Sequence, residues 1–304
     1  MLDSLIIAST QIPDRNDSVV PKDELRIVRS QAVQAEKQRL NQLLLKLRSQ
    51  SRPEMITSTE FSPASTVPKS GSQLYSQRVA ALSTGHLSTR LPRNSFQSTW
   101  SHATQQPTYG QWRALMSREA AIAAKESTTQ QLGVLLGDSL SLWFPSDRLP
   151  QQQTWLNQAI SGDTTRGILR RLSDFAATRP RVIYLMAGIN DLKQGATDNE
   201  ILWNVRQIIT QLRQTQPQAK VIVQSVLPTR LVIASSDRIS QLNRQLRALS
   251  TRNGAYFLDL STQMADTNGN LRQDLTTDGL HLSAKGYATW QSILMKADGA
   301  IATR

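Results

Sequence analysis

The stretch GVLLGDSLSLWFP, residues 133–145, decides the fold of this chain. An apolar run ends abruptly in Gly137, Asp138 and Ser139, and apolar residues resume directly after them. A buried β-strand that leads into a helix produces this pattern and places the serine at the carboxyl end of the strand. Such a serine is either a helix cap or a reactive group at the edge of a sheet. The rest of the chain distinguishes these two interpretations.

The composition limits the class of protein. A length of 304 residues permits one or two domains. Hydrophobic residues make up 39% of the chain, which is below the usual value for a compact protein, so part of it is expected to pack poorly. The absence of cysteine excludes disulfides, thiolate metal sites and a cysteine nucleophile, and it fits a reducing compartment.

The net charge of +12 is spread over the whole chain, without a block of five or six Lys or Arg residues. We therefore expect no nucleic-acid partner. No stretch approaches the length of a transmembrane segment. The first residues, MLDSLIIAST, include the acidic Asp3 and lack the basic start and long apolar region of a signal peptide. These features predict a cytoplasmic protein.

Residues 1–128 are predicted to form an N-terminal extension, with an amphipathic helix at about 22–50. Val33, Leu40 and Leu47 recur there every seven residues. One interpretation is a short coiled coil or membrane-surface helix that contacts an unknown partner. The favoured interpretation is a marginal helix that packs loosely on its own chain, because the heptad pattern is short.

The extension continues with a linker and a second helix. Residues 51–73 are rich in Ser, Thr and Pro, a composition typical of a linker without a packed core. A helical lead-in is expected at about 109–127. The catalytic domain is then predicted to occupy residues 129–304.

This second part alternates five short apolar runs with helical segments. The predicted strands are 132–136, 155–160, 182–186, 221–226 and 256–260. The predicted helices are about 164–177, 198–216, 236–252 and 284–297. This alternation predicts an α/β fold with a three-layer, doubly wound, parallel five-stranded sheet.

Polar clusters follow the first three strands of this predicted sheet. They are residues 137–139, 161–163 and 188–191. In doubly wound folds, sites form at the carboxyl ends of the strands. We therefore expect the three clusters to meet at one edge.

A serine nucleophile requires a base, and only one of the three histidines, His281, lies in the α/β part. Asp278 precedes His281 by three residues, in a predicted loop before the last helix. This spacing lets the carboxylate hold Nδ1 of the imidazole and leave Nε2 free to accept the serine proton. Alone, a single histidine is more often a surface or core residue.

Together, the blocks GDSL (137–140), NQAISGDTT (157–165), GIND (188–191) and DGLH (278–281) resemble the GDSL/SGNH hydrolase superfamily. The resemblance covers about residues 130–300 and implies a flavodoxin-like SGNH hydrolase fold. It implies that Ser139 is the nucleophile and that Asp278 and His281 complete the catalytic group. It also implies an oxyanion hole formed by the backbone N–H groups of Ser139 and Gly162 and by the side-chain amide of Asn190.

The segment ISGDTTRGILRRL, residues 160–172, is similar to the branch near platelet-activating-factor acetylhydrolase and carbohydrate O-acetylesterases. The function that the resemblance implies is a serine esterase that hydrolyses carboxylic esters, with short acyl or O-acetyl groups, through an acyl-enzyme. One alternative is a thioesterase or lysophospholipase with the same site. Another is a binding or scaffold protein on a hydrolase fold, with the extension contacting an acidic partner.

The remaining polar and aromatic residues near these blocks have simpler interpretations. We expect Asp138 and Asp191 to hydrogen-bond loop backbone, and Asp163 to cap a helix. Trp143 and Phe144 either wall an acyl pocket or belong to the core. The chain lacks the G-x-S-x-G pattern, which disfavours the common α/β-hydrolase fold. It has no HExxH motif or Cys/His cluster, so we expect no metal or cofactor.

Overall fold

The computed structural model describes residues 66–126, 132–232 and 234–302. The amphipathic helix expected at 22–50 and the first part of the linker expected at 51–73 lie outside these ranges. Within them, no helix is both long enough and apolar enough to cross a membrane. The described residues belong to one compact unit.

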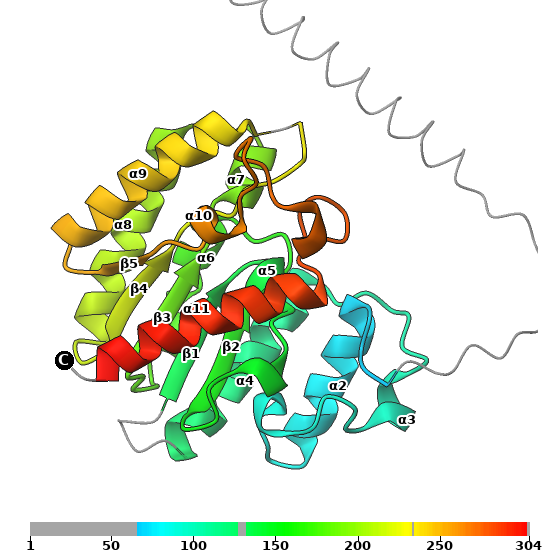
Figure 1. The fold of residues 1–304 in the computed structure, drawn as a ribbon. Helices are drawn as coiled ribbons and strands as arrows, with labels where there is room; N and C mark the ends of the chain where they lie inside the picture. The colour runs from blue at the N-terminus through cyan, green and yellow to red at the C-terminus, as the bar shows by residue number, and fades with distance from the viewer. Residues whose placement is uncertain (1–65, 127–131, 233, 303–304) are drawn as a thin grey trace, which may run out of the picture. The chain divides into compact units, whose positions relative to one another are not determined.

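Five parallel strands form one sheet in the order β2-β1-β3-β4-β5 (Figure 1). The strands are β1 (Leu132–Gly137), β2 (Thr154–Ala159), β3 (Val182–Met186), β4 (Lys220–Gln224) and β5 (Tyr256–Leu258). Their ends differ from the predicted ends by at most two residues. The doubly wound α/β fold expected from the sequence is thereby confirmed.

Helices cover both faces of the sheet. The longer helices that follow the first strand are α8 (Asp198–Thr215), α9 (Ser236–Arg252) and α11 (Ala284–Ala302). Short helical elements connect the strands: α5 (Ser139–Leu142), η2 (Ser146–Arg148), α6 (Thr165–Leu169), η3 (Leu172–Phe175), α7 (Ile189–Lys193), α10 (Ser261–Met264) and η4 (Gln273–Leu275).

Alternation along the strands produces two separate apolar cores. On β1, Val134 and Leu136 belong to the core that α8 and α9 complete, whereas Leu135 belongs to the core under α11. Figure 1 shows α11 crossing the near face of the sheet. Because successive side chains of a strand point to opposite faces, the nearly continuous apolar runs of the strands require this double cover.

The helix predicted at about 164–177 is interrupted. It consists of α6 and η3, with a break at Arg170 and Arg171. At the break, the Arg171 side chain turns inward and is fully buried. The sequence pattern therefore predicted the buried face of this segment but not its interruption. The break occurs where the Arg171 side chain turns inward.

Upstream of the sheet lie α2 (Gly71–Ser83), η1 (Ser88–Arg90), α3 (Gln97–Trp100) and α4 (Tyr109–Glu126). The last of these occupies the segment for which a helical lead-in was expected. Arg78 of α2 forms a buried ion pair with Glu119 of α4, and its Nη2 donates to the Asn157 carbonyl in β2 at 2.8 Å. These contacts attach α2 and α4 to the edge of the sheet. The boundary proposed between residues 128 and 129 is a matter for deletion experiments.

Candidate active site

The register of the three central strands aligns the polar clusters that follow them. Gly137, the last residue of β1, pairs with Ala159 of β2 and with Met186 of β3. A Cβ at Gly137 would lie 2.4 Å from the Met186 carbonyl oxygen, so only glycine fits here. The clusters therefore begin at one level, at the carboxyl edge where sites of this fold form.

Ser139 is the first residue of α5. Asp138 caps this short helix by accepting the backbone N–H of Leu140 at 3.0 Å. The Ser139 N–H belongs to the first turn, where backbone donors lack partners within the helix. The Ser139 hydroxyl lies 3.1 Å from Nε2 of His281. The structure thus brings the predicted nucleophile within hydrogen-bond distance of the predicted base.

His281 and Asp278 lie in the loop between η4 and α11. Nδ1 of His281 is 2.7 Å from Oδ2 of Asp278. The other carboxylate oxygen, Oδ1, accepts the backbone N–H groups of Leu280 at 2.9 Å and His281 at 2.7 Å. An Asp278 carboxylate that accepts the Nδ1 proton leaves Nε2 to face Ser139 as an acceptor.

The same contacts set the protonation of Asp278. Partial burial acts to raise the pKa of Asp278, but the hydrogen bonds from His281 and Leu280 outweigh it and lower this pKa below its usual value. The carboxylate is therefore charged at neutral pH. The side chains of His281 and Asp278 are 42% and 52% exposed, so this part of the site is open to solvent.

Asn190 and Gly162, the other predicted oxyanion donors, lie on two loops that contact each other. Nδ2 of Asn190 donates to the carbonyl oxygen of Asp163 at 3.0 Å, which fixes the amide plane and leaves its second N–H for another acceptor. Gly162 has a φ of 81°, in the left-handed region. No atom lies within 4 Å of a Cβ built there, so the backbone conformation, not space, requires glycine.

Arg171 connects these loops and was missed in the sequence. This arginine, 1% exposed, donates from Nε to Oδ2 of Asp163 at 2.7 Å. Its Nη1 donates to the Gln158 carbonyl at 2.7 Å and its Nη2 to the Gly137 carbonyl at 3.2 Å. One guanidinium therefore joins the ends of β1 and β2 to the loop that carries Gly162.

A signal for this role is present in the sequence. Ile168, Leu172 and Phe175 recur at helical spacing, and Arg171 falls on the same face as these apolar residues. An arginine on an apolar face is rarely buried without a partner. The nearby Asp163 supplies that partner, although Asp163 was predicted to be a helix cap. Thr164 is the cap instead, because its side chain accepts the N–H of Gly167.

Two further carboxylates are buried near Ser139. Asp191 accepts the backbone N–H of Thr165 at 2.9 Å, and Asp138 accepts that of Leu140, so the backbone-binding roles predicted for both are confirmed. Burial raises the pKa of Asp138 to about 7; the Leu140 N–H opposes this, and the charges of Asp163 and Asp191 add to it. Oδ2 of Asp138 is buried without a hydrogen-bond partner in the described part of the chain.

Tyr109, at the start of α4, reaches the same loop from the upstream region. Its hydroxyl donates to Oδ1 of Asp163 at 3.4 Å. Burial, followed by the charge of Asp163, raises the pKa of Tyr109 above its usual value, which keeps the hydroxyl protonated. The N-terminal helices thus contribute a side chain beside the candidate oxyanion hole.

The two aromatic residues after α5 separate. Phe144 is a core residue that packs edge-on against Tyr287 and Trp290 of α11. Trp143 is half-buried and lines a cavity on the α2 side. In the described ranges, no group of three or more His, Asp or Glu side chains is placed to hold a metal ion.

Comparison with known proteins identifies the family of the chain. The sequence profile described as the GDSL-like Lipase/Acylhydrolase family matches residues 126–289. The chain belongs to this family. As a GDSL-like acylhydrolase it is a hydrolase of the esterase and lipase type, as the motifs predicted.

The chain is 28% identical, over 194 residues, to the platelet-activating factor acetylhydrolase IB subunit alpha1 of Pongo abelii. This alignment covers 59% of the chain and 79% of the relative. Two solved structures share the fold. One is a Streptococcus pneumonia protein, with a TM-score of 0.55 at 24% identity, covering 61% of this chain and 92% of the other. The second, a GDSL-like lipase from Bacteroides thetaiotaomicron, has a TM-score of 0.52 at 19% identity and covers 61% and 96%.

Proposed function

We propose that this GDSL-like acylhydrolase is a serine esterase that hydrolyses short-chain carboxylic esters through an acyl-enzyme. The observation that carries the proposal is the continuous path from Ser139 Oγ to His281 Nε2, at 3.1 Å, and from His281 Nδ1 to Asp278 Oδ2, at 2.7 Å. Nucleophile, base and orienting carboxylate in this order define the serine hydrolase triad.

In the acylation step, Ser139 Oγ attacks the ester carbonyl carbon while His281 Nε2 takes the hydroxyl proton. The charged Asp278 stabilises the imidazolium that results. The negative charge on the carbonyl oxygen accepts hydrogen bonds from the N–H groups of Ser139 and Gly162 and from the remaining N–H of Asn190. Collapse of the tetrahedral intermediate breaks the ester C–O bond, and His281 returns the proton to the leaving alcohol.

Deacylation repeats these steps with water. His281 takes a proton from a water molecule, whose oxygen attacks the acyl carbon, and then protonates Ser139 Oγ as the carboxylic acid leaves. Every proton in this cycle passes through His281, so the mechanism needs no metal and no cofactor.

The preference for short acyl groups rests on two observations. The relative in Pongo abelii is named an acetylhydrolase, so its acyl product is the two-carbon acetate. In this chain, the half-exposed side chains of His281 and Asp278 leave the site open. A long acyl chain would find little apolar cover beside them.

A panel of nitrophenyl esters of increasing acyl length tests the proposal, with Ser139→Ala as the control. We expect the highest kcat/KM for acetate or butyrate esters and a loss of about 10⁴- to 10⁶-fold in the variant. A serine-directed phosphonate should label the wild type once and the variant not at all. Undiminished hydrolysis by Ser139→Ala, or a label on another serine, would refute the assignment.

A further inference from the structure

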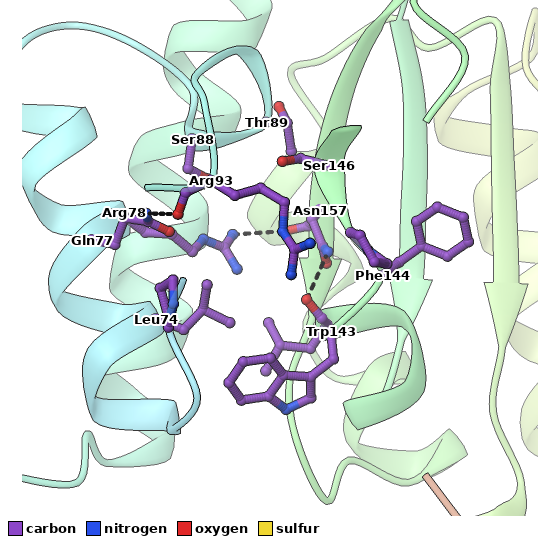
Figure 2. Close-up of a pocket in the computed structure, with 13 residues that line it drawn as sticks. Leu74, Gln77, Arg78, Ser88, Thr89, Arg93, Trp143, Phe144, Ser146 and Asn157 are labelled. Carbon is purple, nitrogen blue, oxygen red and sulfur yellow. Dashed lines mark hydrogen bonds between the residues drawn. The ribbon is translucent and has the colours of Figure 1, made fainter. Parts of the chain in front are cut away.

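A cavity of about 70 Å³ lies between α2 and the segment from α5 to β2. Figure 2 shows side chains from α2 on one side and Trp143, Phe144 and Asn157 on the other. Ser139, Asn190 and His281 do not line it. The cavity is therefore separate from the candidate active site.

One of its two arginines is already neutralised. Arg78 is buried and forms its ion pair with Glu119, which is also buried. Its Nη2 donates to the carbonyl oxygen of Asn157 at 2.8 Å. Arg78 and Glu119 therefore add no net charge to the cavity.

Arg93 supplies an uncompensated charge. Figure 2 shows its side chain reaching in among the residues that line the cavity. The Arg93 guanidinium forms an ion pair with Asp147 at 3.7 Å, and the Asp147 side chain is 63% exposed. Such a pair contributes little because solvent screens it. Arg93 lines the cavity with its side chain 38% exposed, so its N–H donors are accessible to an anionic ligand.

A side chain of α2 fixes the backbone of the loop that carries Arg93. The Arg93 carbonyl oxygen accepts Nε2 of Gln77 at 2.7 Å, and Gln77 is buried in α2. Substitution of the Arg93 side chain would leave this backbone contact in place. The fold therefore fixes the backbone that carries the Arg93 side chain at the cavity.

The other lining residues divide by polarity. In Figure 2 the hydroxyl residues Ser88, Thr89 and Ser146 lie toward one end, whereas Leu74 and Trp143 lie toward the other. A ligand with an anionic head and a small apolar tail matches this division. The cavity volume limits the tail to a few carbon atoms.

We propose that this cavity binds a short-chain monocarboxylate. The carboxylate would accept two parallel N–H donors from the Arg93 guanidinium, a geometry that matches the planar carboxylate group. Its alkyl tail would lie against Leu74 and Trp143. A phosphate dianion fits less well, because a single uncompensated guanidinium leaves much of its charge unpaired and the apolar wall offers it no donors.

The cavity shares a wall with the turn that carries Ser139. Asn157 Nδ2 donates to the carbonyl oxygens of Ser141 at 2.9 Å and Leu142 at 3.3 Å. If the proposed esterase function holds, the ligand has the chemistry of the acid that the enzyme releases. Binding in the cavity does not depend on that function, since no residue of the triad takes part.

The test measures thermal unfolding of the full chain with acetate, propionate or butyrate, against sodium chloride at equal ionic strength. We expect the carboxylates to raise Tm with dissociation constants in the millimolar range and phosphate to match chloride. Arg93→Met should abolish the rise, Arg93→Lys should weaken it several-fold, and Arg244→Met, at an exposed position of α9, should preserve it.

A second arm separates this cavity from the active site. Protein blocked with the serine-directed phosphonate, and the Asn190→Ala variant, should both bind carboxylate with unchanged affinity. Loss of binding in these two proteins, an equal Tm rise in Arg93→Met, or no rise beyond chloride would overturn the proposal. Failure of the phosphonate to label Ser139 would instead contradict the proposed function and leave carboxylate binding to be judged by the Arg93 variants.

Discussion

The two halves of the candidate site are built differently. The oxyanion half contains Asn190, the Gly162 loop and Arg171, and the side chain at its centre, Arg171, is 1% exposed. The base half contains His281 and Asp278, which are 42% and 52% exposed. Contacts between distant segments fix the first half, whereas a three-residue spacing within one loop fixes the second.

This difference predicts how each half responds to substitution. A change in the exposed base half should lower activity and leave folding nearly intact, because solvent replaces the lost contacts. A change in the oxyanion half should affect both, because a buried donor or charge is left without its partner. Paired measurements of turnover and of the free energy of unfolding test the comparison.

Among substitutions in the two halves, Asp278→Asn should give the largest loss of activity. Without the charge at Oδ2, His281 loses the group that orients and stabilises its imidazolium, and kcat should fall by about 10³- to 10⁴-fold. Unfolding by urea should show a change below about 1 kcal/mol, because the side chain is half-exposed. Asp274→Asn, in the preceding turn and 40% exposed, is the matched control and should retain full activity. A large loss of stability in Asp278→Asn would contradict the comparison.

Asn190→Ala should slow acylation by about 10²- to 10³-fold, the effect of removing one oxyanion donor. The free energy of unfolding should also fall, by about 1–3 kcal/mol, because the Asp163 carbonyl loses its buried donor. Asn204→Ala is the control: this buried amide donates to Thr165 Oγ1 at 3.0 Å and should affect stability alone. Pre-steady-state release of nitrophenol measures acylation, and an unchanged rate in Asn190→Ala would remove it from the oxyanion hole.

Arg171→Met should mainly reduce stability, by about 3–5 kcal/mol, since it leaves Asp163 buried without its cation. We expect kcat to fall by about tenfold with KM unchanged, because Arg171 positions the Gly162 loop and does not touch the substrate. The double variant Arg171→Met/Asp163→Asn should recover much of the stability but not kcat. Full recovery of kcat would mean that Arg171 acts only on folding.

Asp138→Asn should produce the smallest effect, visible as a changed pH dependence of stability. The pKa of Asp138 is raised to about 7 by burial, so the folded protein retains a proton that the unfolded chain loses near pH 4. Asp138 therefore lowers stability as pH rises from about 4 to 7. The variant should lack this decrease and be more stable at pH 8, by about 1–2 kcal/mol. Parallel urea titrations at pH 5 and pH 8 measure the difference.

Asp278 titrates in the opposite direction. Its pKa is lowered, so its contribution to stability is present above its unfolded pKa and disappears as pH falls through its folded value. The buried Asp138 and the half-exposed Asp278 therefore respond to acid with opposite signs. If Asp138→Asn and wild type show the same pH profile, the buried carboxylate is not the cause.

The parts of the fold and site that the sequence predicted depend on local patterns. Apolar runs of five or six residues marked the strands, and polar residues at the strand ends marked Ser139, Gly162 and Asn190. Asp278 and His281 lie three residues apart, so the contact between them follows from spacing. The fold then brings together residues that each carried their own local signal.

What the sequence did not predict requires contacts between distant segments. Arg171 donates to Gly137, 34 residues away, and Tyr109 reaches Asp163 across 54 residues. Nothing in the sequence marks Tyr109 for this contact, and the place of Arg171 on an apolar helix face indicates burial but not the partners that it reaches. The break between α6 and η3 belongs to the same class, because Arg171 turns inward there to reach its partners.

The cavity around Arg93 also could not be predicted from the sequence, because its walls come from α2 and β2, which lie far apart in the chain. Trp143 was assigned to either an acyl pocket or the core; it is half-buried and packs against the apolar core, and it also lines this cavity. Phe144, one residue later, is in the core. Adjacent aromatic residues on a short connection point in different directions, and sequence alone does not say which is which.

The packed structure extends beyond the range of the family profile at both ends. The family profile covers residues 126–289, whereas α4 ends at Glu126 and α11 continues to Ala302. Trp112 and Met116 on one side of that range, and Trp290 on the other, are buried. A protein truncated to the range of the family profile would therefore lose these buried residues and expose the apolar surface that they cover. A soluble fragment of this protein should therefore need residues on both sides of the range that the family profile matches.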